Sequence, residues 1–167
     1  ASSGAPEYGF DVDERLLGER VSYAELGISL SAPAGWQALD ADARGALEEI
    51  LAETASAGLE SARLFDLYLS DSQTSALSVF ALDATLSPGE VAEAIAAQTP
   101  GSDRAVFRHA GLEFTQVRSV LDALVSFALI TQVADRQPLL LQYVVAPEGD
   151  ESVMRAVESS IGSIRPE

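Results

Sequence analysis

The residues with the clearest chemical potential form a short basic stretch in the second half of the chain. Arg104, Arg108 and His109 lie within the segment 104–109, and Arg118 follows nearby. Guanidinium groups form paired hydrogen bonds with carboxylates and phosphates, so this stretch is a candidate site for an anion or an acidic partner. Ion pairing with some of the 26 acidic residues of the chain is the alternative interpretation.

Nucleophilic and metal chemistry find little support in the composition. The chain has no cysteine and no lysine, and His109 is its only histidine. Thiolate nucleophiles, thiolate zinc sites, Ser–Lys dyads and histidine-rich metal sites are therefore excluded, and a Ser–His–acid triad would have to use His109. No glycine-rich phosphate loop is present, so we predict no catalytic residue, no metal and no cofactor. A pair of carboxylates could still catalyse hydrolysis, although no pair stands out.

Length and charge narrow the class of protein. A chain of 167 residues with 47% hydrophobic residues is long enough for one globular domain with a substantial core. The formal charge of −16 argues against binding to nucleic acid or to anionic membranes. No apolar run is long enough for a transmembrane helix. The absence of lysine and asparagine fits a GC-rich genome, and the large charge also fits adaptation to salt.

The segment 112–146 has the highest density of apolar residues in the sequence, and the other predicted elements are arranged around it. It reads as three strands joined by short links, and links this short connect antiparallel neighbours. In the middle strand, 124–133, alternate positions are apolar on both sides of the chain. A sheet with one face in water would alternate apolar and polar residues, so both faces of this sheet should be covered.

The remaining elements follow from local patterns. We predict a hairpin over 20–32, strands at 63–70, 76–82 and 104–109, and helices over 42–57, 87–98 and 151–162. The helix at 87–98 has the strongest signal, because Ser87, Pro88 and Glu90 form a capping box. Trp36, which follows the hairpin, is either a binding platform or an apolar plug that closes one end of the core. The predicted class is α+β: an α/β/α sandwich with a mainly antiparallel sheet of six to seven strands and three helices.

The chain divides into a flexible leader, 1–19, and a single domain, 20–167. The leader combines small residues with acidic ones and shows no sustained periodicity. Its small polar start suits a tether behind a removed export signal or an upstream lipid anchor, and a cloning remnant would have the same composition.

Two segments of the domain resemble the PsbP-like α/β/α sandwich family. They are the segment 28–36, ISLSAPAGW, and the segment 159–164, SSIGSI, and the pair Ala110-Gly111 before Leu112 adds to the likeness. The resemblance covers about residues 20–165. The family includes an extrinsic photosystem II subunit, a Ran-binding nuclear import factor and bacterial envelope lipoproteins. The resemblance implies a non-catalytic binding or accessory role, often outside the cytoplasm, and it transfers no ligand site.

Three functions are consistent with these observations. The first is a non-catalytic domain of the bacterial cell envelope, secreted, periplasmic or lipid-anchored, which acts on a protein partner or a small ligand; Trp36, Arg104, Arg108 and His109 are its candidate binding residues. The second is a small hydrolase that uses two carboxylates. The third is an acidic cytoplasmic inhibitor that binds a basic partner through its net charge. The oligomeric state is left open.

Overall fold

The computed structural model describes residues 12–43, 45–46, 63–70, 75–82, 85, 87–98, 101–121, 124–133, 137–145 and 151–166. Within these residues no helix has the length and apolar character needed to cross a membrane. Most of the helix predicted over 42–57 lies outside the described residues; positions 41–43 and 45–46 are helical. The described elements are η1 (Glu14–Leu16), β1 (Leu17–Tyr23), β2 (Ile28–Pro33), β3 (Gln37–Ala38), β4 (Arg63–Leu69), β5 (Ala76–Ala81), α2 (Pro88–Gln98), β6 (Asp103–His109), β7 (Leu112–Leu121), β8 (Leu124–Gln132), β9 (Pro138–Val145), α3 (Glu151–Gly162) and β10 (Arg165–Pro166).

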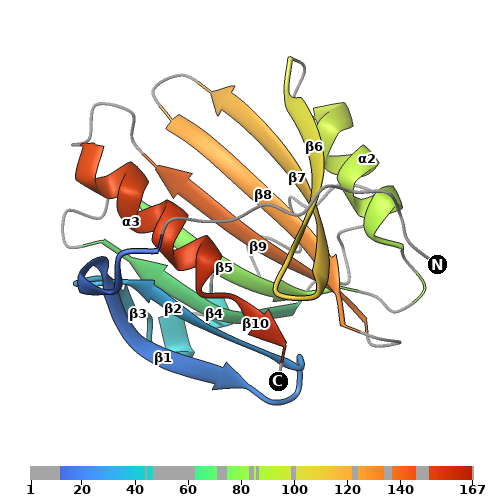
Figure 1. Cartoon of the computed structure of the whole chain (residues 1–167). Coiled ribbons are helices and arrows are strands. Elements are labelled where there is room, and N and C mark those ends of the chain that lie inside the picture. The colour runs from blue at the N-terminus through green and yellow to red at the C-terminus, as the bar shows by residue number, and fades with distance from the viewer. Residues whose placement is uncertain are drawn as a thin grey trace.

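Seven of the strands form one antiparallel sheet in the order β3-β4-β5-β9-β8-β7-β6 (Figure 1). The predicted three-strand segment supplies β7, β8 and β9, which pair in sequence order near the middle of this sheet. A second sheet has the order β1-β2-β10 and is also antiparallel. The predicted α+β class with a seven-stranded antiparallel sheet is therefore confirmed, and the hairpin predicted at 20–32 lies in the second sheet.

Both faces of the large sheet are covered, as the absence of a polar face predicted. On one face, apolar residues of β5, β8 and β9 pack with β2 and with Val157 and Ile161 of α3. On the other face, different residues of the same strands pack against Val91 and Ala92 of α2. Neighbouring residues of one strand enter opposite cores: Leu129 belongs to the first and Ile130 to the second. In Figure 1, α3 crosses one face of the sheet and α2 lies against the other.

Strand β4 departs from the simple alternation predicted for it. The sequence pattern placed Phe65 and Leu67 on one face and Leu64 and Tyr68 on the other. In the structure Leu64 and Leu67 belong to the α2 side, whereas Phe65 and Tyr68 pack on the α3 side. The cause is an irregularity in the pairing with β5 between Leu64 and Asp66, where one extra residue reverses the phase of the strand.

The described part of the predicted leader, residues 12–19, contains η1 and the start of β1. Asp13 caps η1 through its side chain, and its backbone N–H donates to Ser159 Oγ at 3.0 Å. These contacts attach the segment to α3. The division into leader and domain stays a prediction.

The predicted start of α2 is confirmed. The helix begins at Pro88, and the backbone N–H of Glu90 donates to Ser87 Oγ at 3.2 Å. Pro88 at the first helical position costs no hydrogen bond, because that N–H would have no partner inside the helix.

A group of buried serines attaches the C-terminal end of α3 to β2. Ser160 Oγ donates to the carbonyl of Ser31 at 2.7 Å, and the N–H of Ser31 donates to Ser163 Oγ at 2.9 Å. The hydroxyl of Tyr143 in β9 lies 2.8 Å from Ser160 Oγ. Burial raises the pKa of Tyr143, so its hydroxyl stays neutral. Since these residues are buried, the hydroxyls of Tyr143, Ser160 and Ser163 and the backbone of Ser31 need these partners in place of water.

We expect Ser160→Ala to lower the free energy of unfolding by about 1–3 kcal/mol, because it leaves the carbonyl of Ser31 and the hydroxyl of Tyr143 with fewer partners. Chemical denaturation of the full chain measures the change. Ser22→Ala, which alters an exposed serine of β1, is the control and should change stability by less than about 0.5 kcal/mol. Equal effects of the two substitutions would contradict a structural role for the buried group.

Candidate functional site: an arginine pocket beside the end of α3

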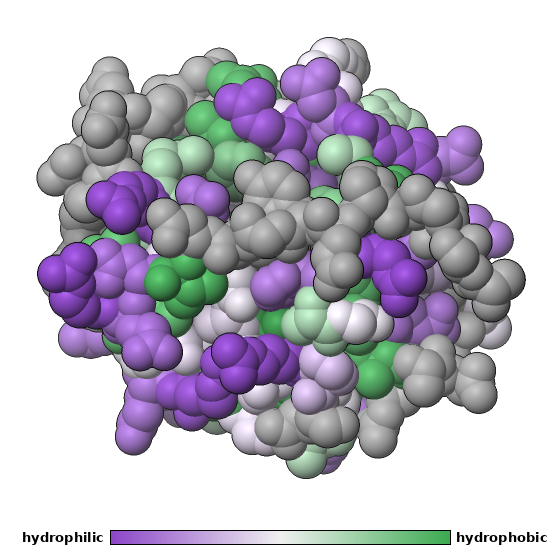
Figure 2. All heavy atoms as spheres, in the orientation of Figure 1, coloured by the Kyte–Doolittle hydropathy of each residue, from purple (hydrophilic) through white to green (hydrophobic). Residues whose placement is uncertain are grey.

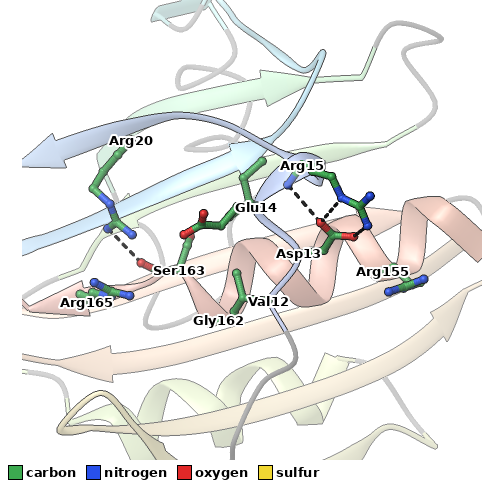
Figure 3. Close-up of a pocket in the computed structure, with 10 residues that line it drawn as sticks. Val12, Asp13, Glu14, Arg15, Arg20, Arg155, Gly162, Ser163 and Arg165 are labelled. Atoms are coloured by element: carbon green, nitrogen blue, oxygen red, sulfur yellow. Dashed lines mark hydrogen bonds and ion pairs between the residues drawn. The ribbon is translucent and has the colours of Figure 1, made fainter.

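A pocket of about 570 Å³ opens between η1, β1, the C-terminal end of α3 and β10 (Figure 3). Its wall includes two acids, Asp13 and Glu14, and the backbone of the α3 end at Gly162 and Ser163. Four arginines also line it: Arg15, Arg20, Arg155 and Arg165. The pocket therefore brings together residues from both ends of the chain.

The charge of this pocket is opposite to that of the whole protein. The chain carries −16 and has ten basic residues, all arginine, of which four line the pocket. Among the described residues of the lining, two acids oppose these four arginines, which is an excess of two positive charges. In Figure 2, hydrophilic side chains gather over β1, which forms one side of the pocket. A local positive site in an acidic protein favours an anionic ligand.

Two of the four arginines are held by the protein itself. Arg20 donates from Nη1 to Ser29 Oγ and to the carbonyl of Ser163, each at 3.0 Å. Arg15 forms a paired interaction with the carboxylate of Asp13, with two side-chain contacts of 3.1 Å. These hydrogen bonds fix the positions of both guanidinium groups at the rim of the pocket.

The other two arginines make fewer contacts with the described part of the chain. Arg155 on α3 and Arg165 on β10 are exposed, and within the described chain neither side chain makes a hydrogen bond or an ion pair. Figure 3 shows them on opposite sides of the pocket, with Gly162 and Ser163 between them. A guanidinium group that makes no hydrogen bond to the described residues can form a forked pair of hydrogen bonds with a carboxylate or phosphate.

Electrostatics favour binding over proton transfer at this site. The hydrogen bond from Arg15 is the main reason that the pKa of Asp13 lies below its ordinary value, and Arg155 adds a smaller attraction. The same contact raises the pKa of Arg15. A general acid at neutral pH needs a raised pKa, so the environment of Asp13 is unsuited to that role. Within the described residues, no group of three His, Cys, Asp or Glu side chains could hold a metal ion.

The residues predicted from the sequence lie elsewhere. Arg104 and Arg108 are exposed on β6, and Arg104 Nη2 is 3.4 Å from the carbonyl of Gly89 at the start of α2. His109 is half-buried, and its Nε2 donates to the carbonyl of Gly162 at 2.9 Å, so it supports the end of α3. Trp36 is half-buried and packs against the core on the α3 side.

The sequence analysis did not single out the four pocket arginines, because they are far apart along the chain. Arg15 and Arg20 flank the start of the first strand, whereas Arg155 and Arg165 lie on either side of the SSIGSI segment. That segment and the segment 28–36 carried the family resemblance, and the structure shows them in contact. The signal that could have revealed part of the site was the pair Arg155 and Arg165, which flanks the SSIGSI segment.

Comparison with known proteins gives the fold. No known family profile matches the sequence, and no curated protein matches it significantly. The solution structure of cyanobacterial PsbP from Synechocystis sp. PCC 6803 has a TM-score of 0.57 and 13% identity, and covers 100% of this chain and 98% of that chain. This similarity shows the fold alone and confirms the resemblance predicted from the sequence.

Two further solved structures are similar. A crystal structure from Bacteroides thetaiotaomicron VPI-5482 has a TM-score of 0.52 and 11% identity, and covers 90% of this chain and 48% of that chain, so this chain spans about half of that protein. LpqN, involved in cell envelope biogenesis of Mycobacterium tuberculosis, has a TM-score of 0.46 and 12% identity, and covers 96% of this chain and 98% of that chain.

We expect Arg15→Gln to raise the pKa of Asp13 toward the ordinary value of an aspartate. Because the pKa is lowered in the folded chain, the capping contact is complete above the unfolded value and is lost only as the pH falls through the folded value. The carboxyl carbon shift of Asp13, followed by NMR during an acid titration, measures this. Arg165→Gln removes one charge from the same pocket and should have a smaller effect; equal shifts would contradict the hydrogen bond as the main cause.

Proposed function

We propose that this chain, which has a PsbP-like fold, is a non-catalytic binding domain that acts outside the cytoplasm and recognises an anionic group of its partner in the arginine pocket. The observation that carries the proposal is the placement of Arg155 and Arg165 around one recess of an acidic protein, because neither guanidinium group makes a hydrogen bond or an ion pair with a described residue. The resemblance to a family that includes envelope lipoproteins supports the location. The SSIGSI segment forms both the core contact and the floor of the pocket.

The ligand chemistry follows from the donors. Guanidinium groups donate hydrogen bonds and accept none, so the pocket selects an acceptor with several oxygens, either a carboxylate or a phosphate. Both acids that line the pocket oppose a fully charged ligand, because Asp13 stays ionised and Glu14 lies at the same rim. The expected affinity for an isolated anion is therefore modest, and contacts elsewhere on the partner would have to add to it.

The pocket is tested with two probes, citrate and inorganic phosphate, titrated into the labelled full chain and followed by amide NMR. We expect saturable shifts at Gly162, Ser163 and Arg165. Arg155→Glu with Arg165→Glu should weaken binding at least about tenfold, since each lost charge-assisted hydrogen bond costs about 1.5–3 kcal/mol.

The matched control is Arg104→Glu with Arg108→Glu, which changes the net charge equally on β6. It should leave binding of both probes in the pocket unchanged. The absence of a saturable shift with either probe, or equal weakening by both double variants, would overturn the pocket assignment.

The location is tested separately by expressing the natural gene product in its own host, followed by fractionation and mass determination of the N-terminus. A cleaved or lipid-modified product in the envelope fraction is the expected result. A cytoplasmic product with an intact N-terminus would contradict the location without affecting the pocket. In that case the acidic-inhibitor hypothesis would replace the envelope role.

A further inference from the structure

Among the described residues, β6 forms one edge of the large sheet, and the hydrogen-bonding pattern of β6 is defined by the turn that follows it. Ala110 and Gly111 have positive φ angles of 53° and 83° and form a two-residue turn between β6 and β7. In such a hairpin the flanking residues, here His109 and Leu112, exchange hydrogen bonds with each other. The pairing continues without interruption to the start of β6.

Alternate residues of β6 therefore direct their backbone groups away from the sheet. Counting back from His109, the residues bonded to β7 are at odd positions, and Arg104, Val106 and Arg108 present their N–H and C=O groups outward. Within the described chain, no further backbone hydrogen bond involves these three residues. Figure 1 shows β6 as the last strand on this side of the sheet.

The side chains of the same three residues lie on one face of the strand. Arg104 and Arg108 are exposed and flank Val106, whose side chain keeps 41% of its surface exposed. The two arginines are four residues apart, so their α-carbons are separated by about 13 Å along the strand. The strand thus offers an exposed valine between two cations, beside backbone donors and acceptors without a partner among the described residues. These features suit pairing with an added strand whose side chains complement them.

We infer that β6 is a docking site for an extended acidic segment of a partner protein, which adds to the sheet as an eighth strand beside β6. Its backbone would pair with the outward groups of Arg104, Val106 and Arg108. Residues directly opposite each other on neighbouring strands have their side chains on the same face of the sheet. The docked segment therefore carries an apolar residue opposite Val106, with an acidic residue two positions before it and another two positions after it. Opposite-charge pairs across neighbouring strands are stabilising.

A second copy of this chain does not suit the same edge. Antiparallel pairing of two β6 strands about Val106 would place Arg104 of one copy opposite Arg108 of the other, twice. Like charges directly opposite each other destabilise a strand pair. The two arginines thus oppose self-association and favour an acidic strand, which is a common way to protect an exposed edge.

The test uses the full chain and three synthetic peptides in amide NMR titrations. The first, Thr-Glu-Thr-Val-Thr-Glu-Thr, has the required spacing. The second, Thr-Thr-Glu-Val-Glu-Thr-Thr, has the same composition and charge but presents its acids on the other face. The third replaces both glutamates of the first peptide with lysine. We expect the first peptide to shift the amides of Arg104, Val106 and Arg108 and to protect them from hydrogen exchange, with at least about fivefold weaker binding of the other two.

Charge-reversed variants complete the test. Arg104→Glu with Arg108→Glu should reverse the preference in favour of the lysine peptide. Arg155→Glu with Arg165→Glu, which changes the pocket, should keep the wild-type order of the peptides.

Arg108→Glu alone makes the edge self-complementary, because Arg104 then faces a glutamate of the second copy. This variant should form dimers detectable by sedimentation. Peptide shifts confined to the pocket, equal binding of the two acidic peptides, or no shift on β6 would each overturn the proposal, even if the single variant dimerises.

Discussion

The position of α3 depends on hydroxyl groups that have been removed from water. Ser31, Ser160 and Ser163 are each at most 5% exposed, and their hydrogen bonds connect the end of the helix to the backbone of β2. An apolar contact at this point would tolerate small shifts, because burial energy is insensitive to direction. Hydrogen bonds have preferred distances and angles, and a buried group without a partner carries a high cost. The serines therefore fix both the position and the orientation of α3.

The arginine pocket is a consequence of this arrangement. Its floor, Gly162 and Ser163, belongs to the helix end that the serines hold, and Arg20 binds the carbonyl of Ser163 from the opposite side. The carbonyl groups at a helix C-terminus carry partial negative charge, so a cation is stabilised there. Arg20 has this structural role, and its charge is partly balanced by the helix end. Arg155 and Arg165 make no such hydrogen bond to a described residue, and the proposed ligand would pair with them.

Much of the fold could be predicted from the sequence because its elements are encoded locally. Both faces of β8 and β9 are apolar, and the structure covers both; the capping box at Ser87 starts α2 where expected. The phase of β4 could not be predicted in this way, since an extra residue opposite β5 reverses the alternation and no local pattern reveals it. The separate three-stranded sheet was also beyond local reasoning, because β10 reaches β2 only after α3 has returned the chain to the start of the domain.

The site was harder to predict than the fold for the same reason. Arg15 and Arg165 are distant in sequence and become neighbours of one pocket only through the contact of β2 with α3. The basic stretch at 104–109 was visible because its charges are close together in sequence, although the structure divides its roles: His109 supports the α3 end, whereas Arg104 and Arg108 lie on the sheet edge.

The chain has more than twice as many acids as bases. A group of arginines that outnumbers the acids around it is therefore a local positive region in a negative protein. The charges of such a region interact with a ligand mainly at short range, because salt screens electrostatic interactions beyond about 8 Å at physiological ionic strength. Recognition by this protein is therefore expected to depend on contact geometry at these arginines.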